Sequence, residues 1–240
     1  MKIVEGRDHR WDVTIPDARE IQQFLRTQVI LRSFYQPVRR IIAVDVSYSR
    51  FEKLGFAVLG EFTCDYDNAT GLYNIQDVLF LKRNGTVGFP YVPGYLSFRE
   101  IPMLIPLFEQ IENPPDLILV DGAGIAHPRE LGLASHLGVI FDVPTIGCAK
   151  SRLIGEFQEP SQRKGCVSTL NMKGKQVGIV LRSKDKVRPL FISPGHLTDV
   201  RTSSEIILRF CSKYRIPEPL RLVDAISKEL RRETSKQSME

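Results

Sequence analysis

Three acidic residues of the chain stand where a carboxylate is hard to accommodate. Asp45 interrupts an apolar run, Ile41 to Val46, Asp121 directly follows a second apolar run, and Glu100 comes after a proline-rich aromatic segment. A carboxylate inside a buried strand, or at its tip, is costly unless a positive charge lies beside it. A divalent cation would serve, and ligand oxygens alone favour Mg²⁺, with Mn²⁺ able to substitute. The three acids therefore predict a magnesium site.

Each of these acids also has an ordinary structural interpretation. Asp45 could simply face solvent, because side chains alternate between the two faces of a strand, although Asp is a poor strand former. Asp121 could cap a turn. Glu100 could close a capping box with Ser97. Pro102 argues against that box, because a proline so early would disrupt the first turn. We therefore predict a helix that begins near Pro102 and leaves Glu100 just before it.

Four further residues have side chains suited to the same chemistry. Asp224 shares a helix face with the apolar residue Leu220 and is a candidate fourth carboxylate at the edge of the core. His127 and Lys150 are candidate cations that could hold a phosphate beside the metal. Tyr91 stands between two prolines, whose fixed φ angles make a stiff projection. It is either an ordinary loop residue or a wedge that pushes into a base stack.

The apolar pattern of the chain predicts the elements that must hold these residues. Three consecutive strands with short connections form an antiparallel meander, and the run before Asp121 is typical of a parallel strand buried on both faces. Together they indicate a mixed-sheet α/β domain. The expected strands are 41–47, 55–63, 73–82, 116–120, 143–149, 177–182 and 189–192. The expected helices are 15–29, 102–111, 128–141 with Pro128 at its first position, 203–211 with a capping box of Thr202 and Glu205, and 218–232 before a disordered tail, 233–240.

Length and composition fit one globular domain. The chain has 240 residues, of which 42% are hydrophobic, and a formal net charge of +5, which is compatible with a polyanionic partner. Basic residues crowd the segment 163–188, which we interpret as a solvated hairpin. The alternative is a ridge that contacts a nucleic-acid backbone in a salt-dependent way. The sequence has no C-x-x-C pair, apolar leader or membrane-length apolar run, so we expect reduced thiols and a cytoplasmic protein that does not bind membranes.

Several segments of the chain resemble those of the endonuclease V family, in order and along nearly the whole chain. They are 9–12 (HRWD), 41–49 (IIAVDVSYS), 89–100 (FPYVPGYLSFRE), 120–153, 193–196 (SPGH) and 215–219 (RIPEP). The resemblance implies a ribonuclease-H-like mixed sheet, an antiparallel meander plus parallel strands, flanked by helices in one domain over 1–232. It also implies a magnesium-dependent DNA repair endonuclease, deoxyribonuclease V. Such an enzyme hydrolyses the second phosphodiester bond 3′ to deoxyinosine and leaves 3′-hydroxyl and 5′-phosphate ends.

The resemblance assigns catalytic roles to individual residues. Asp45 and Asp121 match the metal-binding aspartates of the family. Glu100 matches its catalytic glutamate, which we expect to contribute to the metal shell. Asp224 matches a fourth position of the site. The resemblance further implies that two cations, Lys150 and His127, line it.

Residues for substrate binding follow from the same resemblance. Tyr91 matches the tyrosine of a wedge that separates the strands, and we expect its neighbours in the segment to contribute. Four glycines match the backbone around a pocket for the flipped hypoxanthine. Ala123 departs from the family pattern, because a longer polar residue stands there in other members. The expected substrate-binding residues are Tyr91, Pro90, Val92, Pro93, Gly94, Gly122, Gly124 and Gly132.

Two other functions remain open at this point. The same acids could serve an endoribonuclease specific for inosine in RNA, since metal-aided hydrolysis of a phosphodiester does not itself distinguish the sugar. A non-catalytic binder of deaminated nucleic acid is the second alternative, and the intact acid set argues against it. We expect a monomer whose partner is DNA with deoxyinosine or another deaminated base.

Overall fold

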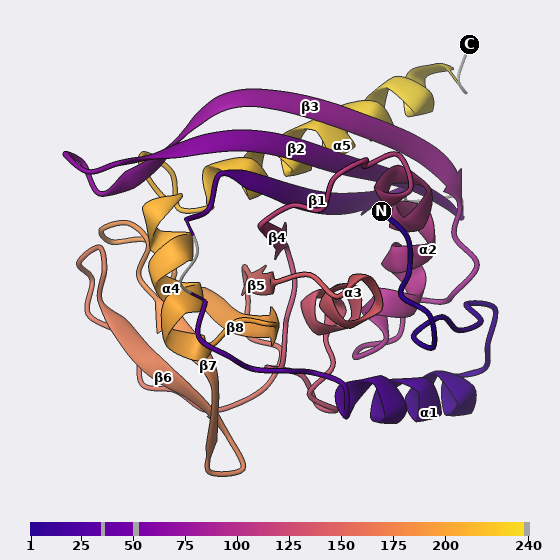
Figure 1. The fold of residues 1–240 in the computed structure, drawn as a ribbon, viewed down its shortest axis with the longest axis horizontal. Helices are drawn as coiled ribbons and strands as arrows, with labels where there is room; N and C mark the ends of the chain where they lie inside the picture. The colour runs from indigo at the N-terminus through magenta and orange to yellow at the C-terminus, as the bar shows by residue number, and fades with distance from the viewer. Residues whose placement is uncertain (35–36, 50–52, 238–240) are drawn as a thin grey trace.

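An eight-stranded mixed sheet forms the centre of the molecule in a computed structural model, which describes residues 1–34, 37–49 and 53–237 (Figure 1). The strands lie in the order β3-β2-β1-β4-β5-β8-β7-β6, with β1, β4 and β5 parallel to one another and the other pairs antiparallel. Their bounds are β1 Arg40–Tyr48, β2 Leu54–Asp67, β3 Leu72–Thr86, β4 Leu117–Val120, β5 Thr145–Ala149, β6 Val167–Met172, β7 Lys175–Leu181 and β8 Leu190–His196. The predicted meander is β1 to β3, and the predicted parallel strand is β4.

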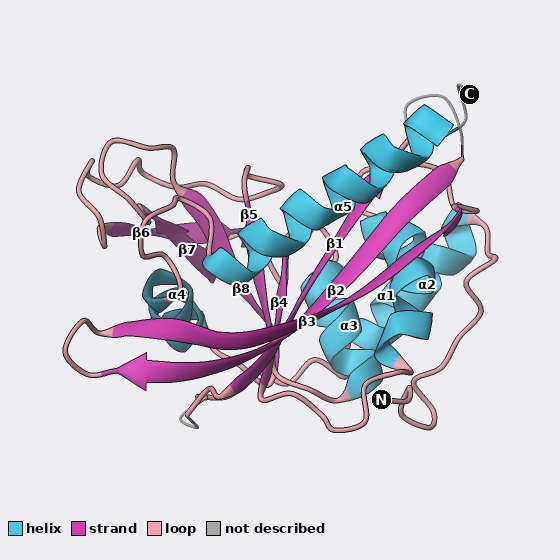
Figure 2. Ribbon diagram, turned by 90° about the horizontal axis from the view of Figure 1, so that it is seen from above, coloured by secondary structure: helices cyan, strands magenta, loops and turns pink. Residues whose placement is uncertain are grey.

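Helices cover both faces of this sheet (Figure 2). Three of them, α1 (Ile15–Arg26), α2 (Leu96–Phe108) and α3 (Leu133–Phe141), lie on one side. The long helix α5 (Glu218–Gln237) crosses the opposite side, and α4 (Val200–Arg209) shares an apolar cluster with it. None of the helices in the described ranges is long and apolar enough to cross a bilayer.

The alternation of side chains along β1 explains why both faces are covered. Ile42 and Val44 belong to the apolar cluster beneath α2 and α3, whereas Ile41 and Ala43 belong to the cluster beneath α5. All four are at most 2% exposed. Because each buried aliphatic side chain of this size contributes about 1.5–3 kcal/mol, helices on both faces are needed to exclude water from this strand.

The start of α2 differs from the prediction. The helix begins at Leu96 and contains both Pro102 and Pro106, so Glu100 lies inside it and not before it. Neither proline has an amide to donate, and each would cost about 3 kcal/mol in an exposed helix. The helix buries Ile101, Leu104 and other apolar side chains against the sheet. The free energy gained by that burial outweighs the unfavourable helix propensity of the two prolines.

Three other helix boundaries also differ from the prediction. The segment after Pro128 is not helical, because Glu130 adopts a left-handed φ of 52°, and α3 begins only after Gly132. Helix α4 is capped by the side chain of Asp199, not by a Thr202–Glu205 box. Helix α5 continues to Gln237, beyond the predicted end at 232, and 238–240 lie outside the described residues.

The basic segment contains a strand that the sequence pattern does not predict. Strand β6 pairs antiparallel with β7, which confirms the interpretation of this segment as a hairpin. The alternation in β6 is weak, because Val167 at its start is exposed and only Leu170 and Met172 are buried. The hairpin forms the outer edge of the sheet beyond β8.

Candidate active site

Two aspartates reach the same edge of the sheet through neighbouring parallel strands. Val44 of β1 pairs with Val120 of β4, and the next residue after each valine is an aspartate, Asp45 and Asp121. Because Ile41 and Ala43 face α5, the period of two places Asp45 on the face covered by α5. The same alternation in β4 places Asp121 there as well, because Leu117 and Leu119 belong to the α5-side cluster.

A third carboxylate comes from the helix that covers this face. Carboxylate oxygens of Asp45, Asp121 and Asp224 all lie within 4.8 Å of one another, and all three residues are half-buried. We call these three residues the acid group. The ammonium of Lys150, directly after β5, lies 2.5 Å from Asp121 Oδ2 and 2.8 Å from Asp224 Oδ1. Strands β1, β4 and β5 and helix α5 therefore converge on one charged site.

The acid group has the donor chemistry of a site for a hard divalent cation. It offers only carboxylate oxygens, which suit Mg²⁺ or Mn²⁺ better than a soft metal. Lys150 shows that a positive charge is stabilised at this point: burial opposes its charge, but Asp121 and Asp224 raise the pKa of the ammonium above its ordinary value. The residues present thus fit a bound metal ion.

The carboxyl of Asp45 is costly to ionise. Burial raises the pKa of its carboxyl, a hydrogen bond from Ser227 opposes that shift, and the charge of Asp121 adds to it. Ser227 follows Asp224 by three residues, so both side chains project from one face of α5. The backbone carbonyl of Ser227 in turn accepts from Ser47 Oγ at 2.8 Å.

Glu100 approaches the acid group from the other face of the sheet. It lies on α2, is 8% exposed, and accepts a hydrogen bond from the Tyr48 hydroxyl at 3.2 Å. Burial raises the pKa of its carboxyl well above the ordinary value, and the charges of Asp45 and Asp121 contribute to the same shift. Glu100 is close enough to interact with two members of the acid group, yet Asp224 is the residue that completes that group.

The Tyr91 segment is a rigid projection. Tyr91 is 73% exposed, whereas Phe89 and Tyr95 on either side are buried in an aromatic cluster with Phe98. The turn after the segment needs a glycine, because Gly94 has a φ of +82° and an added Cβ would lie 2.9 Å from a nitrogen of Arg129. An exposed aromatic side chain on a segment whose two ends are buried fits the predicted wedge.

Three side chains hold the carbonyl oxygen of Gly94. Gln22 Nε2 donates to it at 3.0 Å, Arg129 Nη2 at 2.5 Å, and His127 Nε2 lies 3.0 Å away. Burial, with the nearby charge of Arg129, lowers the pKa of His127 to about 4. The prediction of a cationic His127 is therefore wrong near neutral pH. The imidazole is neutral and fixes the loop of the wedge.

A cavity of about 110 Å³ lies beside the wedge. We call it the base pocket. Its wall includes Gly94 and Gly132 as predicted, and Ala123, the position that departs from the family pattern. Gly122 and Gly124 do not line it: an added Cβ on Gly124 would lie 2.0 Å from Pro194 O, so that glycine permits close packing of two chain segments. The lining residues are Tyr91, Val92, Pro93, Gly94, Leu96, Ser97, Ala123, His127, Leu131, Gly132, Leu133 and Leu153.

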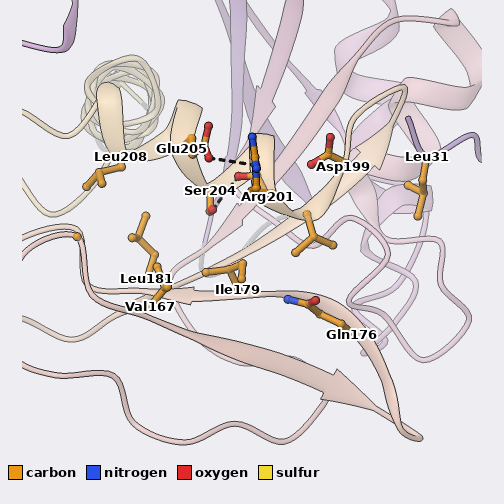
Figure 3. Close-up of a pocket in the computed structure, with 12 residues that line it drawn as sticks. Leu31, Val167, Gln176, Ile179, Leu181, Asp199, Arg201, Ser204, Glu205 and Leu208 are labelled. Carbon is orange, nitrogen blue, oxygen red and sulfur yellow. Dashed lines mark hydrogen bonds and ion pairs between the residues drawn. The ribbon is translucent and has the colours of Figure 1, made fainter. Parts of the chain in front are cut away.

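A larger cavity, of about 730 Å³, lies elsewhere on the molecule (Figure 3). It is bounded by helix α4 and the β6–β7 hairpin, and apolar residues such as Leu31, Ile179 and Leu208 form much of its wall. It shares no residue with the acid group or the base pocket. Size alone therefore does not identify the active site of this protein.

The family model for endonuclease V matches residues 23–225 of the chain. The chain belongs to the endonuclease V family. An endonuclease V from Nostoc punctiforme is 41% identical over 92% of this chain and 97% of its own, and one from Dictyoglomus turgidum is 43% identical over 88% of each chain. The family consists of metal-dependent nucleases, which agrees with the donor set of the acid group.

Solved structures of the endonuclease V family have the same fold. The enzyme from Streptomyces avermitilis matches with a TM-score of 0.82 at 36% identity, covering 98% of both chains. Endonuclease V from Ciona intestinalis, in complex with a 23mer DNA containing an inosine followed by a ribo-adenosine, matches with a TM-score of 0.74 at 26% identity over 92% of this chain and 100% of its own. The predicted ribonuclease-H-like mixed sheet is thereby confirmed.

Several residues that support the site are absent from the sequence prediction. Arg215 donates to the carbonyl oxygens of Arg188 at 2.7 Å, Lys150 at 2.8 Å and Pro189 at 2.8 Å, and so ties the residue after β5 to the start of β8. Ser227 could have been found from its spacing to Asp224 on a helix. The partners of Arg215 are backbone atoms far along the chain, for which the sequence has no signal.

Proposed function

We propose that the chain is a magnesium-dependent endonuclease that cuts DNA at deoxyinosine, at the second phosphodiester bond on the 3′ side. The observation that carries this proposal is the convergence of three carboxylates and an ammonium on one sheet edge, within the endonuclease V fold. The base pocket and the exposed Tyr91 support a substrate with an extruded base. A relative solved with inosine-containing DNA supports the choice of lesion. Removal of such lesions is a step of DNA repair.

Each residue near the acid group has a distinct part in the proposed hydrolysis. Asp45, Asp121 and Asp224 would hold the metal. When bound, a magnesium ion activates water and stabilises charge on the leaving oxygen. Lys150 stays protonated at neutral pH and can donate to a non-bridging phosphate oxygen. Glu100 would complete the metal shell directly or through water. Attack of a water on phosphorus would break the bond to the 3′ oxygen, which leaves 3′-hydroxyl and 5′-phosphate ends.

Recognition of the lesion would use Tyr91 and the base pocket rather than the charged acid group. Tyr91 would insert between stacked bases and take the place of the base that has left the stack. The base pocket would hold hypoxanthine against the backbone of Gly94 and Gly132. Ala123 contributes no polar side chain to that wall, so recognition at this point depends on backbone groups. A cut displaced from the lesion would follow from an offset of the base pocket and the acid group along the bound strand.

A cleavage assay on matched oligonucleotides tests the proposal. With Mg²⁺, DNA containing a single deoxyinosine should give one product, cut one nucleotide beyond the lesion, and the same DNA with deoxyguanosine should stay intact. Chelation of the metal should stop the reaction. Mn²⁺ should restore it. Cutting of the undamaged DNA at the same rate would contradict the proposed lesion specificity.

The same assay distinguishes the two alternative functions. A matched RNA oligonucleotide with a single inosine is included because the Ciona relative was solved with a ribo-adenosine after the inosine. Faster cutting of the RNA would make the protein an endoribonuclease. A lesion complex that forms but never turns over with either metal would make it a binder. Sedimentation of the free protein and of its DNA complex tests the expected monomer.

A further inference from the structure

A second cleft is lined by Lys150, the residue that pairs with two members of the acid group. It has a volume of about 480 Å³, and we call it the basic cleft. Its lining includes Lys150 with the two residues that follow, and the chain that leads into β8. Its lining residues are Lys150, Ser151, Arg152, Phe157, Glu159, Gln162, Arg182, Lys186, Val187, Arg188, Pro189 and Phe191.

Three cations of this cleft have no acid to neutralise them. Arg152, Lys186 and Arg188 are exposed, and within the described ranges none of them forms an ion pair with a carboxylate. Glu159 also lines the cleft, but it is paired at 2.6 Å with Arg182. An open cleft with uncompensated charge of one sign attracts a polyanion.

The basic residues of segment 163–188 divide into two kinds. Arg182 is 2% exposed and donates to the carbonyl of Pro160 at 2.7 Å as well as to Glu159, so it is part of the framework. The ammonium of Lys164 donates to Cys211 O at 2.6 Å. Lys186 and Arg188 are exposed and line the basic cleft. They are the two exposed residues of the predicted backbone-contacting ridge that lie in this cleft.

The order of strands places the basic cleft next to the acid group. Asp45 is on β1, Asp121 follows β4, Lys150 follows β5, and the chain that leads into the next strand, β8, lines the cleft. Ala149 pairs with Phe191, so the end of β5 and the start of β8 lie side by side. Leu153 lines the base pocket, whereas Lys150 lines the cleft, so segment 150–153 borders both cavities.

We propose that the basic cleft binds the backbone phosphates of the nucleic-acid strand on the 3′ side of the cleaved bond. The inference rests on the proposed function: Lys150 pairs with Asp121 and Asp224 and also lines this cleft, so a strand whose cleaved phosphate lies at the acid group has its next phosphates beside the cleft. Arg152, Lys186 and Arg188 bind successive phosphates there, and Lys150 marks the point where the cleft meets the reacting phosphate. Contacts of this kind hold the strand in register without reading its sequence.

The test uses a double variant of two cleft residues that the proposed chemistry does not employ. Lys186→Gln with Arg188→Gln removes two cations and should raise the KM for deoxyinosine DNA with a long 3′ flank roughly tenfold, with little change in kcat. In binding measurements without divalent metal, log affinity falls as log salt rises, and the variant should make this slope shallower by roughly 1.4. That is about 0.7 for each phosphate of the single strand that is no longer neutralised. On a substrate that ends just beyond the cleaved bond, the variant should match the wild type.

A matched control separates this effect from a loss of net charge. Arg201→Gln with Lys213→Gln also removes one arginine and one lysine, both exposed and outside the basic cleft. This control should keep the KM and the salt slope of the wild type. Equal effects of the two double variants, or an effect that persists on the substrate without a 3′ flank, would overturn the assignment of the cleft. Wild-type protein that leaves deoxyinosine DNA intact would instead refute the proposed function, which the wild-type reaction of the same assay shows.

Discussion

The acid group and the base pocket lie close together but are built in opposite ways. The acid group and Lys150 are fixed by regular elements: two paired parallel strands and one helix for the acids, and the end of a third strand for the lysine. The base pocket is formed mainly by loops, and its geometry depends on three donors that meet at the carbonyl of Gly94. One region crowds like charges, whereas the other keeps its buried histidine neutral.

Because of this difference, the two regions should respond differently when activity and stability are both measured. At Asp45, burial raises the pKa of the carboxyl against the hydrogen bond from Ser227, and the charge of Asp121 adds to the shift, so the ionised Asp45 opposes folding, whereas Asp121 and Asp224 are paired with Lys150. In the base pocket, the residues that shape the wall also stabilise the loop. Substitution of Asp45 should therefore abolish activity without loss of stability. In the base pocket, substitution of an exposed residue should affect activity alone, and substitution of a buried residue should also lower stability.

The largest effect is expected for Asp45→Asn. Cleavage should fall roughly a thousandfold, because a carboxylate of the acid group is lost. Without metal the free energy of unfolding should be unchanged or slightly higher, because a buried charge has been removed. Added Mg²⁺ should raise the melting temperature of the wild type but not of the variant.

Asp77→Asn is the matched control for this experiment, because Asp77 is exposed on β3 and remote in sequence from the acid group. It should retain both cleavage and the magnesium-dependent rise in melting temperature. A clear loss of stability in Asp45→Asn without metal would contradict the view that the ionised Asp45 opposes folding.

A pair of substitutions in the segment of Tyr91, beside the base pocket, should affect activity and stability separately. Tyr91→Ala should lower lesion cutting roughly 10- to 100-fold, because stacking of a base on an aromatic ring contributes about 1–3 kcal/mol. Its unfolding free energy should change by less than about 0.5 kcal/mol, because the side chain is 73% exposed. Phe89→Ala, two residues earlier and 7% exposed, should instead cost about 3–5 kcal/mol of stability. Equal cutting by Tyr91→Ala and wild type would remove the wedge from the mechanism.

The neutral histidine of the base pocket should make stability depend on pH. The folded-state pKa of His127 is about 4, below the ordinary 6.5, so the unfolded chain binds more protons between these values. The contribution of His127 is therefore fully present above about pH 6.5 and is lost as the pH falls towards 4. Between pH 7 and pH 5 the loss should be about 2 kcal/mol.

Chemical denaturation of His127→Gln across this range measures that contribution. The variant lacks the titrating group, so the gap between its unfolding free energy and that of the wild type should narrow as the pH falls. Other buried histidines remain in both proteins and cancel in the difference. A gap that stays constant from pH 7 to pH 5 would mean that His127 is not held neutral by the fold.

The part of the site built from regular strands is accessible from the sequence. Asp45 and Asp121 stand out because each follows an apolar strand run, and parallel pairing of β1 with β4 then brings them together. A rule about proline that holds for isolated helices places Glu100 before its helix. That prediction is wrong because the burial of α2 against the sheet is a tertiary effect that no local rule contains.

The part that depends on long-range backbone contacts is not accessible. The sequence presents His127 as a cation, and only its burial beside Arg129 and the Gly94 carbonyl makes it neutral. Of the glycines predicted for the pocket, Gly94 and Gly132 line the wall of the cavity, while Gly124 serves the packing of backbone on backbone. A glycine has no side chain whose type could indicate which of these roles it has.

The smallest effect should come from Arg215, which positions the acid group without touching it. Its guanidinium donates to the carbonyls of Lys150, Arg188 and Pro189, and a lysine cannot satisfy three acceptors in that arrangement. Arg215→Lys should lower kcat roughly tenfold, because the ammonium of Lys150 loses its fixed position. The KM on a substrate that ends just beyond the cleaved bond should be unchanged. Arg221→Lys, a substitution at a half-buried arginine that pairs with Glu218 on α5, should leave kcat as it is. A raised KM on a substrate with a long 3′ flank, with normal kcat, would instead mean that Arg215 acts through Arg188 in the wall of the basic cleft. The change in kcat compared with the change in KM therefore decides which carbonyl partner of Arg215 matters for catalysis.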